Sequence, residues 1–99
     1  MFDEKRYVTK GINEKIPEYL QNLLWFMVET MDTTKKDFLQ VFELQDTLED
    51  GIPMQKIIHS QEQPPYHKEH ILSTRKPVNA KVYIIDIGTY STMILPEEY

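Results

Sequence analysis

The clearest periodic pattern in the chain lies between residues 17 and 31, PEYLQNLLWFMVETM. When residues are placed about 100° apart, the leucines and methionines gather on one side, which is typical of a helix that packs on a sheet. This apolar stripe consists of Leu20, Leu23, Leu24, Met27 and Met31. Pro17 suits the first turn, where a missing backbone N–H costs nothing. The pattern therefore predicts one main helix over about 17–31.

One large aromatic residue breaks the amphipathic pattern of this helix. Trp25 falls roughly 140° from the centre of the stripe, among polar residues such as Gln21 and Glu29. Two explanations remain open. Either the loop at 64–79 covers the indole, or the indole lies at a surface for a partner, since exposed aromatic patches mark interaction sites. Phe26 lines the flank of the same helix.

Five further segments predict strands by their alternation or by their content of β-branched and aromatic residues. These segments are 6–12, 38–45, 54–62, 80–87 and 90–95. A turn at 46–51 joins the second to the third, and a turn around Gly88 joins the fourth to the fifth, so both pairs are expected to form hairpins. The long segment 63–79 is predicted as a packed loop with one helical turn at 67–72.

These elements predict a single α+β domain over 1–99, with the order strand–helix–strand–strand–loop–strand–strand. One main helix packs on a mostly antiparallel sheet of about five strands. Such a helix is about 10 Å wide and covers only about half of one face. The strand at 80–87 is nevertheless apolar on both sides, with Val82 and Ile84 on one and Tyr83 and Ile85 on the other. We expect the long loop, a curled sheet or another chain to cover the second face.

Composition narrows the classes of function. The chain has 16 acidic and 11 basic residues, a net charge of −5, and no basic cluster, which disfavours binding to nucleic acid. It has no cysteine, so disulfides and thiolate chemistry are absent. The charged start lacks the apolar core of a signal peptide, and no segment has the ~20 apolar residues of a membrane span. These features predict a cytoplasmic protein without membrane association.

Candidate chemistry is sparse. His59, Glu62, His67 and His70 offer the side chains of a zinc, iron or nickel site if the loop brings them together. Serine, histidine and aspartate are all present, but none stands in the sequence context of a nucleophilic triad. Asp86 precedes Gly88 and is typical of a turn. No cofactor is expected, and an enzyme is the less favoured class.

Several segments together resemble one family. They are RYVTKGI, IPEYLQNLLW, DFLQVFELQ, KIIHSQEQPPY and DIGTYSTMILPEEY, and they follow one another over nearly the whole chain. The chain is similar to a family of short, uncharacterised proteins of Gram-positive, Firmicute-type bacteria, classed as a domain of unknown function. The resemblance implies a stand-alone bacterial cytosolic protein, and it supplies no catalytic residue, ligand or cofactor.

The sequence therefore favours a small protein that binds a protein partner or a second copy of itself. The candidate contact residues are Trp25 and Phe26 on the helix and Tyr83 and Ile85 on the second sheet face, because tyrosine and tryptophan are frequent at interface centres. The alternative is a small-molecule or metal-dependent enzyme that uses residues 59–70. That alternative requires the histidines and Glu62 to converge in one pocket.

Overall fold

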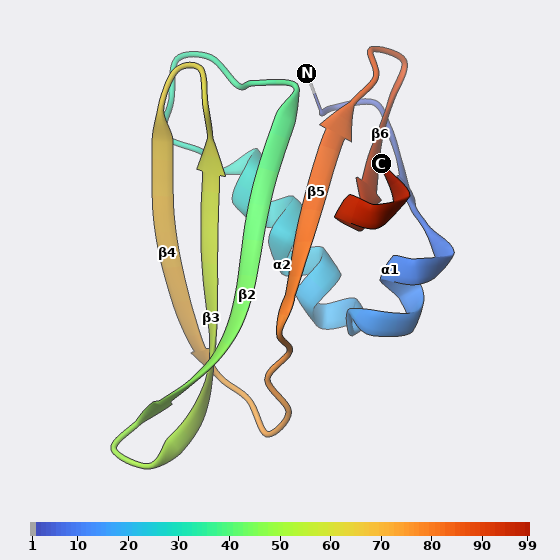
Figure 1. The fold of residues 1–99 in the computed structure, drawn as a ribbon. Helices are drawn as coiled ribbons and strands as arrows, with labels where there is room; N and C mark the ends of the chain where they lie inside the picture. Colours follow the sequence, from blue (N-terminus) through green and yellow to red (C-terminus); the bar gives the residue numbers. More distant parts are fainter. Residues whose placement is uncertain (1) are drawn as a thin grey trace.

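A computed structural model describes residues 2–99 of the chain as a single sheet with its main helix packed on one side (Figure 1). The strands are β1 (Lys5–Val8), β2 (Leu39–Glu49), β3 (Ile52–Gln61), β4 (Tyr66–Ser73), β5 (Ala80–Asp86) and β6 (Tyr90–Ile94). The helices are α1 (Lys10–Lys15), α2 (Glu18–Glu29) and the short 3-10 helix η1 (Pro96–Glu98). The predicted α+β class with α2 as its main helix is confirmed.

The strands within residues 2–99 form a six-stranded sheet in the order β1-β6-β5-β2-β3-β4. Only β1 and β6 are parallel, and the other neighbours are antiparallel. The prediction of a mostly antiparallel sheet is therefore confirmed, and the prediction of about five strands is roughly right, since the sheet has one strand more. The β2–β3 hairpin also turns later than expected, at Asp50 and Gly51, which both have positive φ angles. Asp-Gly is a preferred pair for a two-residue hairpin turn of this kind.

The additional strand is β4, which occupies the segment predicted as a loop. Instead of a helical turn at 67–72, residues 66–73 pair with β3 in an antiparallel ladder, with His67 opposite Ser60 and Leu72 opposite Gln55. The strand lies at the edge of the sheet, where few of its side chains are buried. Charged residues are common on edge strands. The hydrophobic alternation that identifies a strand in a sequence is consequently weak here.

The N-terminal strand is shorter than the predicted segment 6–12. It ends at Val8, and Thr9 caps α1 by accepting a hydrogen bond at Oγ1 from the Ile12 N–H, 3.2 Å away. Gly11 lies inside α1 rather than at the end of a strand. A Cβ atom there would come within 2.9 Å of a Leu95 methyl carbon, so the glycine permits close packing of α1 on the C-terminal segment.

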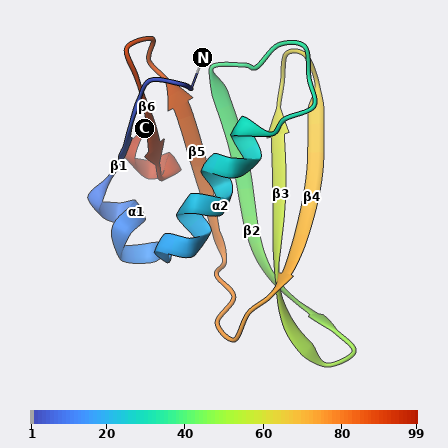
Figure 2. The ribbon, with the colours of Figure 1, turned by 180° about the vertical axis from the view of Figure 1, so that it is seen from behind.

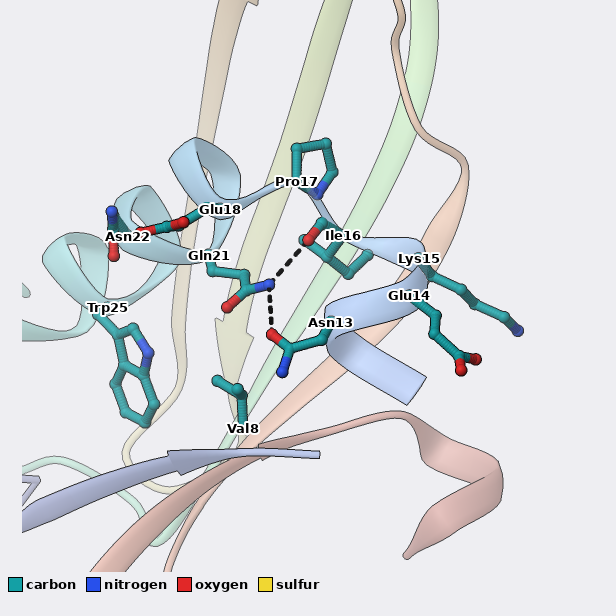
Figure 3. Close-up of a pocket in the computed structure, with 10 residues that line it drawn as sticks. All are labelled: Val8, Asn13, Glu14, Lys15, Ile16, Pro17, Glu18, Gln21, Asn22 and Trp25. Carbon is teal, nitrogen blue, oxygen red and sulfur yellow. Dashed lines mark hydrogen bonds between the residues drawn. The ribbon is translucent and has the colours of Figure 1, made fainter. Parts of the chain in front are cut away.

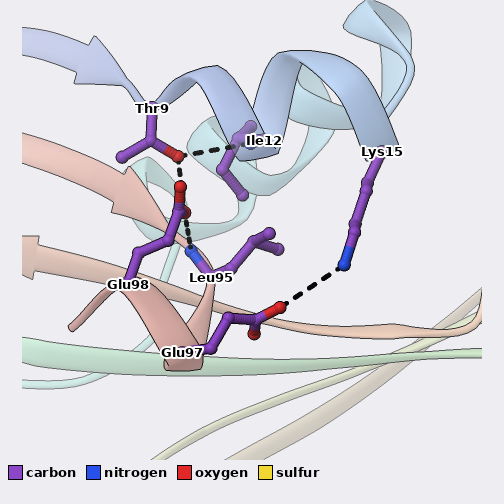
Figure 4. Close-up of polar contacts among 6 residues, drawn as sticks. All are labelled: Thr9, Ile12, Lys15, Leu95, Glu97 and Glu98. Carbon is purple, nitrogen blue, oxygen red and sulfur yellow. Dashed lines mark hydrogen bonds and ion pairs between the residues drawn. The ribbon is translucent and has the colours of Figure 1, made fainter.

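The last residues do not form a free acidic tail. The Glu98 carboxylate accepts hydrogen bonds from the Thr9 hydroxyl at 2.7 Å and from the Leu95 N–H at 2.9 Å (Figure 4). Glu97 and Lys15 form an ion pair of 3.4 Å. The two ends of the chain are thus joined beside α1.

Helix α2 lies against one face of the sheet, behind the strands in Figure 1 and in front of them in Figure 2. Leu20 and Leu24 are fully buried and Met27 is 7% exposed, which confirms the apolar stripe. Trp25 is also buried, with 7% of its surface exposed. The Arg6 guanidinium of β1 lies 4.8 Å from the indole ring and forms a 2.6 Å ion pair with Glu29 of α2.

The position of Trp25 differs from the expected cover by the segment 64–79. In this structure Arg6 of β1 lies over the indole, and Val8 of the same strand lines a cleft with it. Strand β1 pairs with β6 at the edge of the sheet, and the buried surface of α2 is wider than a single stripe. A helix that contacts the sheet on one side and β1 on the next buries apolar residues outside the predicted stripe.

Candidate interaction surface

The strands present their alternate side chains to two faces, and only one of these carries α2. Cross-strand pairs share a face, so the pairing register assigns each residue. The covered face contains Phe42, Leu44, Ile57, Val82, Ile84 and Met93, all of them buried. The other face is called the open face here, and its centre consists of Leu39, Val41, Ile58, Tyr83, Ile85 and Ile94.

The centre of the open face is apolar and continuous across three neighbouring strands. Val41 of β2 stands opposite Tyr83 of β5, and Tyr83 stands opposite Ile94 of β6. Most of these side chains are half-buried, because their neighbours in the sheet shield them in part. They are sufficiently apolar that contact with another apolar surface would be favourable.

Tyrosines border this apolar centre. Tyr7 of β1 and Tyr90 of β6 make an edge-to-face pair with ring centroids 5.4 Å apart. Tyr99, beyond η1, makes a similar pair with Tyr83 at 5.8 Å, which places the end of the chain on the same face. Such pairs hold aromatic rings in defined positions. The border therefore combines apolar area with phenolic hydroxyl groups.

Charged side chains of opposite sign are neighbours on the open face. Lys56 and Glu69 form an ion pair of 3.0 Å, and this hydrogen bond lowers the pKa of the Glu69 carboxyl. Glu43 stands directly opposite Lys81 in the β2–β5 ladder. The Lys81 ammonium also lies 5.8 Å from the Tyr83 ring. The interior of this face consequently offers no concentrated charge of either sign.

The structure separates the four predicted contact residues. Tyr83 and Ile85 lie on the open face, although Ile85 is only 5% exposed. Phe26 lies on α2 and is 56% exposed, so it belongs to the helical side of the molecule. Trp25 was a candidate because its indole was expected to be exposed. The side chain is buried, so that expectation is wrong.

The four candidate metal ligands do not converge. His59 is fully buried on the covered face, whereas His67 stands opposite Ser60 on the open face. His70 pairs with Ile57 and so points to the other side of the sheet from His67, because residues three apart in a strand face opposite ways. Glu62 lies beyond the end of β3. Across residues 2–99, no group of three or more His, Cys, Asp or Glu side chains is arranged to hold a metal ion.

Asp86 serves the turn, as predicted. Its carboxylate accepts a hydrogen bond from the Gly88 N–H at 2.7 Å and another from the Phe2 N–H at 3.1 Å. Gly88 has a φ of 108°, which glycine adopts without strain. The carboxylate therefore holds the β5–β6 connection and fixes the start of the chain beside it.

A group of buried polar residues lies on the covered face beyond the reach of α2. Gln40 donates from Nε2 to Gln61 Oε1 at 2.7 Å and to the Asp37 carbonyl at 2.9 Å. Gln61 in turn donates to the carbonyls of Lys35 and Pro64. Glutamine side chains thus satisfy the backbone of the segments that close this end of the core. Their alternation with apolar residues is their only signal in the sequence.

His59 belongs to the same group. Because the Gln40 amide nitrogen already donates twice, Gln40 Oε1 is the acceptor, and the 2.7 Å contact assigns the proton to His59 Nε2. The imidazole stacks on Phe42 with centroids 4.3 Å apart. Burial, aided by the Lys68 charge, lowers the pKa of His59 from 6.5 to about 4. The ring is therefore neutral at pH 7, which is the form that suits a buried site.

Taken together, these features define a two-layer α+β protein whose main helix covers one side of the sheet only. A family model described as staphylococcal protein of unknown function (DUF960) matches residues 5–98, and the chain belongs to this family. The resemblance noted in the sequence is confirmed. A comparison with curated proteins gave no match.

A solved structure has a similar fold. It is a crystal structure described as that of a protein of unknown function from Enterococcus faecalis, with a TM-score of 0.73 and 20% sequence identity. The match covers 98% of this chain and 92% of that chain. At this identity the likeness concerns the fold alone. Within residues 2–99, no helix is long and apolar enough to cross a membrane.

Proposed function

We propose that this protein is a self-associating module, in which the open face of one copy packs against the open face of a second. The observation that carries the proposal is the apolar centre of the open face, which α2 leaves uncovered. Two sheets packed face to face bury such residues between layers about 10 Å apart. A two-fold axis through the contact brings identical residues together.

The dimensions of the molecule support this proposal. Its extents are 43 × 30 × 20 Å, and the shortest of these corresponds to one helix layer on one sheet layer, each about 10 Å thick. The broad side is large compared with the roughly 800 Å² that each partner contributes to a standard interface. A contact over the open face therefore has sufficient area for a stable dimer.

The charges also favour a second copy as the occupant. The ion pair Lys56–Glu69 and the opposite charges of the cross-strand neighbours Glu43 and Lys81 leave the centre of the face nearly neutral, so an identical face meets little local repulsion. A strongly charged partner would find nothing complementary there. The net charge of −5 on each copy opposes association at a distance, and salt should reduce that repulsion. Moderate salt is thus expected to strengthen the dimer.

The test is analytical ultracentrifugation over a range of protein concentrations, with Val41→Lys as the disrupting variant. Val41 lies at the centre of the open face, and the long lysine side chain can reach water in a monomer but not in a dimer. The matched control is Phe26→Lys, which places the same charge on the exposed side of α2. We expect the first to weaken dimerisation at least about tenfold and the second to leave it unchanged.

Three outcomes would overturn the proposal. The first is a protein that remains monomeric at millimolar concentration. The second is a Val41→Lys variant that associates as strongly as the unchanged chain, and the third is a Phe26→Lys variant whose dimer dissociates. The last outcome would place the contact on the helical side of the molecule. Circular dichroism of each variant confirms that the fold is retained, so that a loss of association is not a loss of structure.

A further inference from the structure

A cleft opens on the helical side of the molecule, between β1, α1 and the first turns of α2 (Figure 3). Its volume is about 660 Å³, which lies within the usual range for ligand sites. Val8 and Trp25 supply apolar surface, and Asn13 and Gln21 supply amide groups. None of these residues lies on the open face, so an inference about the cleft does not depend on self-association.

The two amides are held in a fixed orientation by each other. Gln21 donates from Nε2 to Asn13 Oδ1 at 3.2 Å and to the Ile16 carbonyl at 2.8 Å. Gln21 is only 8% exposed, so this geometry is set by its surroundings. The arrangement leaves Gln21 Oε1 as an acceptor and Asn13 Nδ2 as a donor, because the opposite ends of both amides are occupied.

The indole of Trp25 adds a second donor. Its ring is nine-tenths buried, but its Nε1–H has no hydrogen-bond partner among residues 2–99 and is not one of the fully buried atoms, so it remains open to a ligand. Figure 3 shows the nitrogen-bearing edge of the indole turned towards the side chain of Gln21. An indole N–H acts as a hydrogen-bond donor only. The cleft thus combines two donors and one acceptor around an apolar surface.

The backbone of β1 contributes further hydrogen-bonding groups. The Thr9 N–H donates to the Met93 carbonyl at 3.2 Å, which shows that the odd-numbered residues direct their backbone groups to β6. In a parallel ladder the alternate residues point the other way. The N–H and C=O groups of Val8 therefore face the outer edge of β1, beside the cleft, where a further strand could pair with them.

The charges around the cleft select against anions. Glu14 and Glu18 both line it. Glu14 has a long contact of 3.9 Å with the exposed Lys10, whereas Glu18 forms no ion pair within residues 2–99, and the Lys15 ammonium is directed to Glu97, 3.4 Å away. Arg6 is likewise held by Glu29 and by the Trp25 ring. An acidic ligand would meet repulsion here, whereas a neutral or basic one would not.

We propose that this cleft binds a short, extended peptide with neutral or basic side chains, whose backbone pairs with Val8 at the outer edge of β1. A peptide backbone carries one donor and one acceptor in every residue, which matches the free amide groups of Asn13 and Gln21 and the indole N–H of Trp25. An apolar side chain of the peptide would rest on Val8 and Trp25. Such short additions to a sheet edge obtain affinity from main-chain hydrogen bonds and specificity from side-chain contacts.

Trp25 is the single tryptophan of the chain, so its fluorescence reports on the cleft directly. The probe is a blocked tetrapeptide of alternating valine and lysine, titrated into the full chain. We expect saturable binding, with a dissociation constant on the order of 100 μM for so small a contact. The same peptide with glutamate in place of lysine should bind at least about tenfold more weakly, because Glu14 and Glu18 repel it.

A third peptide separates backbone recognition from unspecific attraction of positive charge. It keeps the valine and lysine side chains but carries methyl groups on its backbone nitrogens, which removes the donors. We expect about a tenfold loss of affinity, since one good hydrogen bond is worth roughly 1.4 kcal/mol. Equal binding of the methylated and unmethylated peptides would overturn the proposal, as would an unchanged Trp25 fluorescence up to millimolar peptide.

Substitutions locate the contact. Asn13→Ala removes an exposed side chain that donates into the cleft, and it should weaken the valine–lysine peptide severalfold to tenfold. The matched control is Gln45→Ala, which removes an exposed amide from the open face and should change nothing. If Asn13→Ala loses the fold by circular dichroism, the methylated peptide decides the question on the unchanged protein. Sedimentation of the same samples shows whether the dimer persists, so the two proposals fail independently.

Discussion

The covered face and the open face of the sheet come from the same strands, but their chemistry does not follow the usual division. The covered face contains Phe42, Val82 and Ile84, and also the buried polar residues Gln40 and His59. The open face contains Val41 and Tyr83 at its centre and few polar groups there. A sheet with one solvated face normally alternates apolar and polar residues more strictly.

The limited length of α2 explains why the covered face contains buried polar residues. The helix covers the middle of the sheet, but the end near Asp37 and Gln61 is closed by connecting segments with their own backbone groups. A buried backbone group without a partner costs free energy, and a glutamine in the core supplies that partner. The polar residues of the covered face therefore occur where connecting segments, rather than α2, cover the sheet.

The open face differs from the covered face in what lies over it. No helix as long as α2 covers its apolar centre within residues 2–99, and Tyr99 packs on Tyr83 at one side of it. Its charges include the ion pair Lys56–Glu69 and the cross-strand neighbours Glu43 and Lys81. The covered face is completed by this chain, while the open face would be completed by association. Three predictions test this contrast, beginning with the largest expected effect.

Removal of an aromatic ring should be far more costly on the covered face. Phe42 is fully buried and stacks on His59, so Phe42→Ala should lower the free energy of unfolding by about 3–5 kcal/mol. Tyr83 is half-buried, and Tyr83→Ala should cost about 1–2 kcal/mol in the monomer. Urea denaturation at low protein concentration measures both. Similar losses for the two variants would show that the faces are equally covered.

Acid should destabilise the covered face through His59. The pKa of this imidazole is about 4 in the folded chain and 6.5 in the unfolded chain, so the unfolded state binds more protons between these values. Stability is complete above pH 6.5 and falls as the pH decreases. The loss attributable to His59 should reach about 2 kcal/mol at pH 5.

The control for this prediction is His59→Gln, which keeps a hydrogen-bonding side chain but does not titrate. Urea unfolding at pH 7.5, 6 and 5 should show a much flatter dependence for this variant. His67 and His70 are exposed and remain in both proteins. If the unchanged chain and the variant lose stability in parallel, the pH dependence arises elsewhere.

The smallest effect comes from a matched pair of valines. Val82→Thr places a hydroxyl group in the fully buried core and should cost about 1–2 kcal/mol, because the group loses water without gaining a partner. Val41→Thr makes the same change on the open face and should alter the stability of the monomer by less than about 0.5 kcal/mol. Thermal unfolding of dilute samples compares them. A reversed order would contradict the assignment of the two faces.

Local patterns in the sequence predicted the elements whose stability depends on neighbours in the chain. The leucine stripe identified α2, and the β-branched residues of 80–87 identified β5. The turn predicted at 46–51 contains the Asp50-Gly51 pair, at which the hairpin turns in the structure. Helix α1 was not predicted, because its residues were assigned to the first strand and to a turn. By contrast, β4 gave no periodic signal, because an edge strand with few buried side chains needs none.

The candidate sites show the same limit. The four candidate metal ligands were close in sequence, but strand geometry separates His67 from His70, and burial removes His59 from solvent. The cleft was missed because its residues come from β1, α1 and α2, and neither Asn13 nor Gln21 belongs to a motif. Only the hydrogen bond between their side chains reveals which groups remain free.

The sequence by itself determined the α+β class, the main helix, most of the strands, the family and the surplus of apolar residues on a second sheet face. These properties depend on local propensity and on periodicity, which neighbouring residues encode. The tertiary structure decided what covers Trp25, where β4 lies and which polar groups are left for a ligand. These depend on contacts between segments far apart in the chain, such as Arg6 with Trp25 and β1 with β6, for which no local pattern exists.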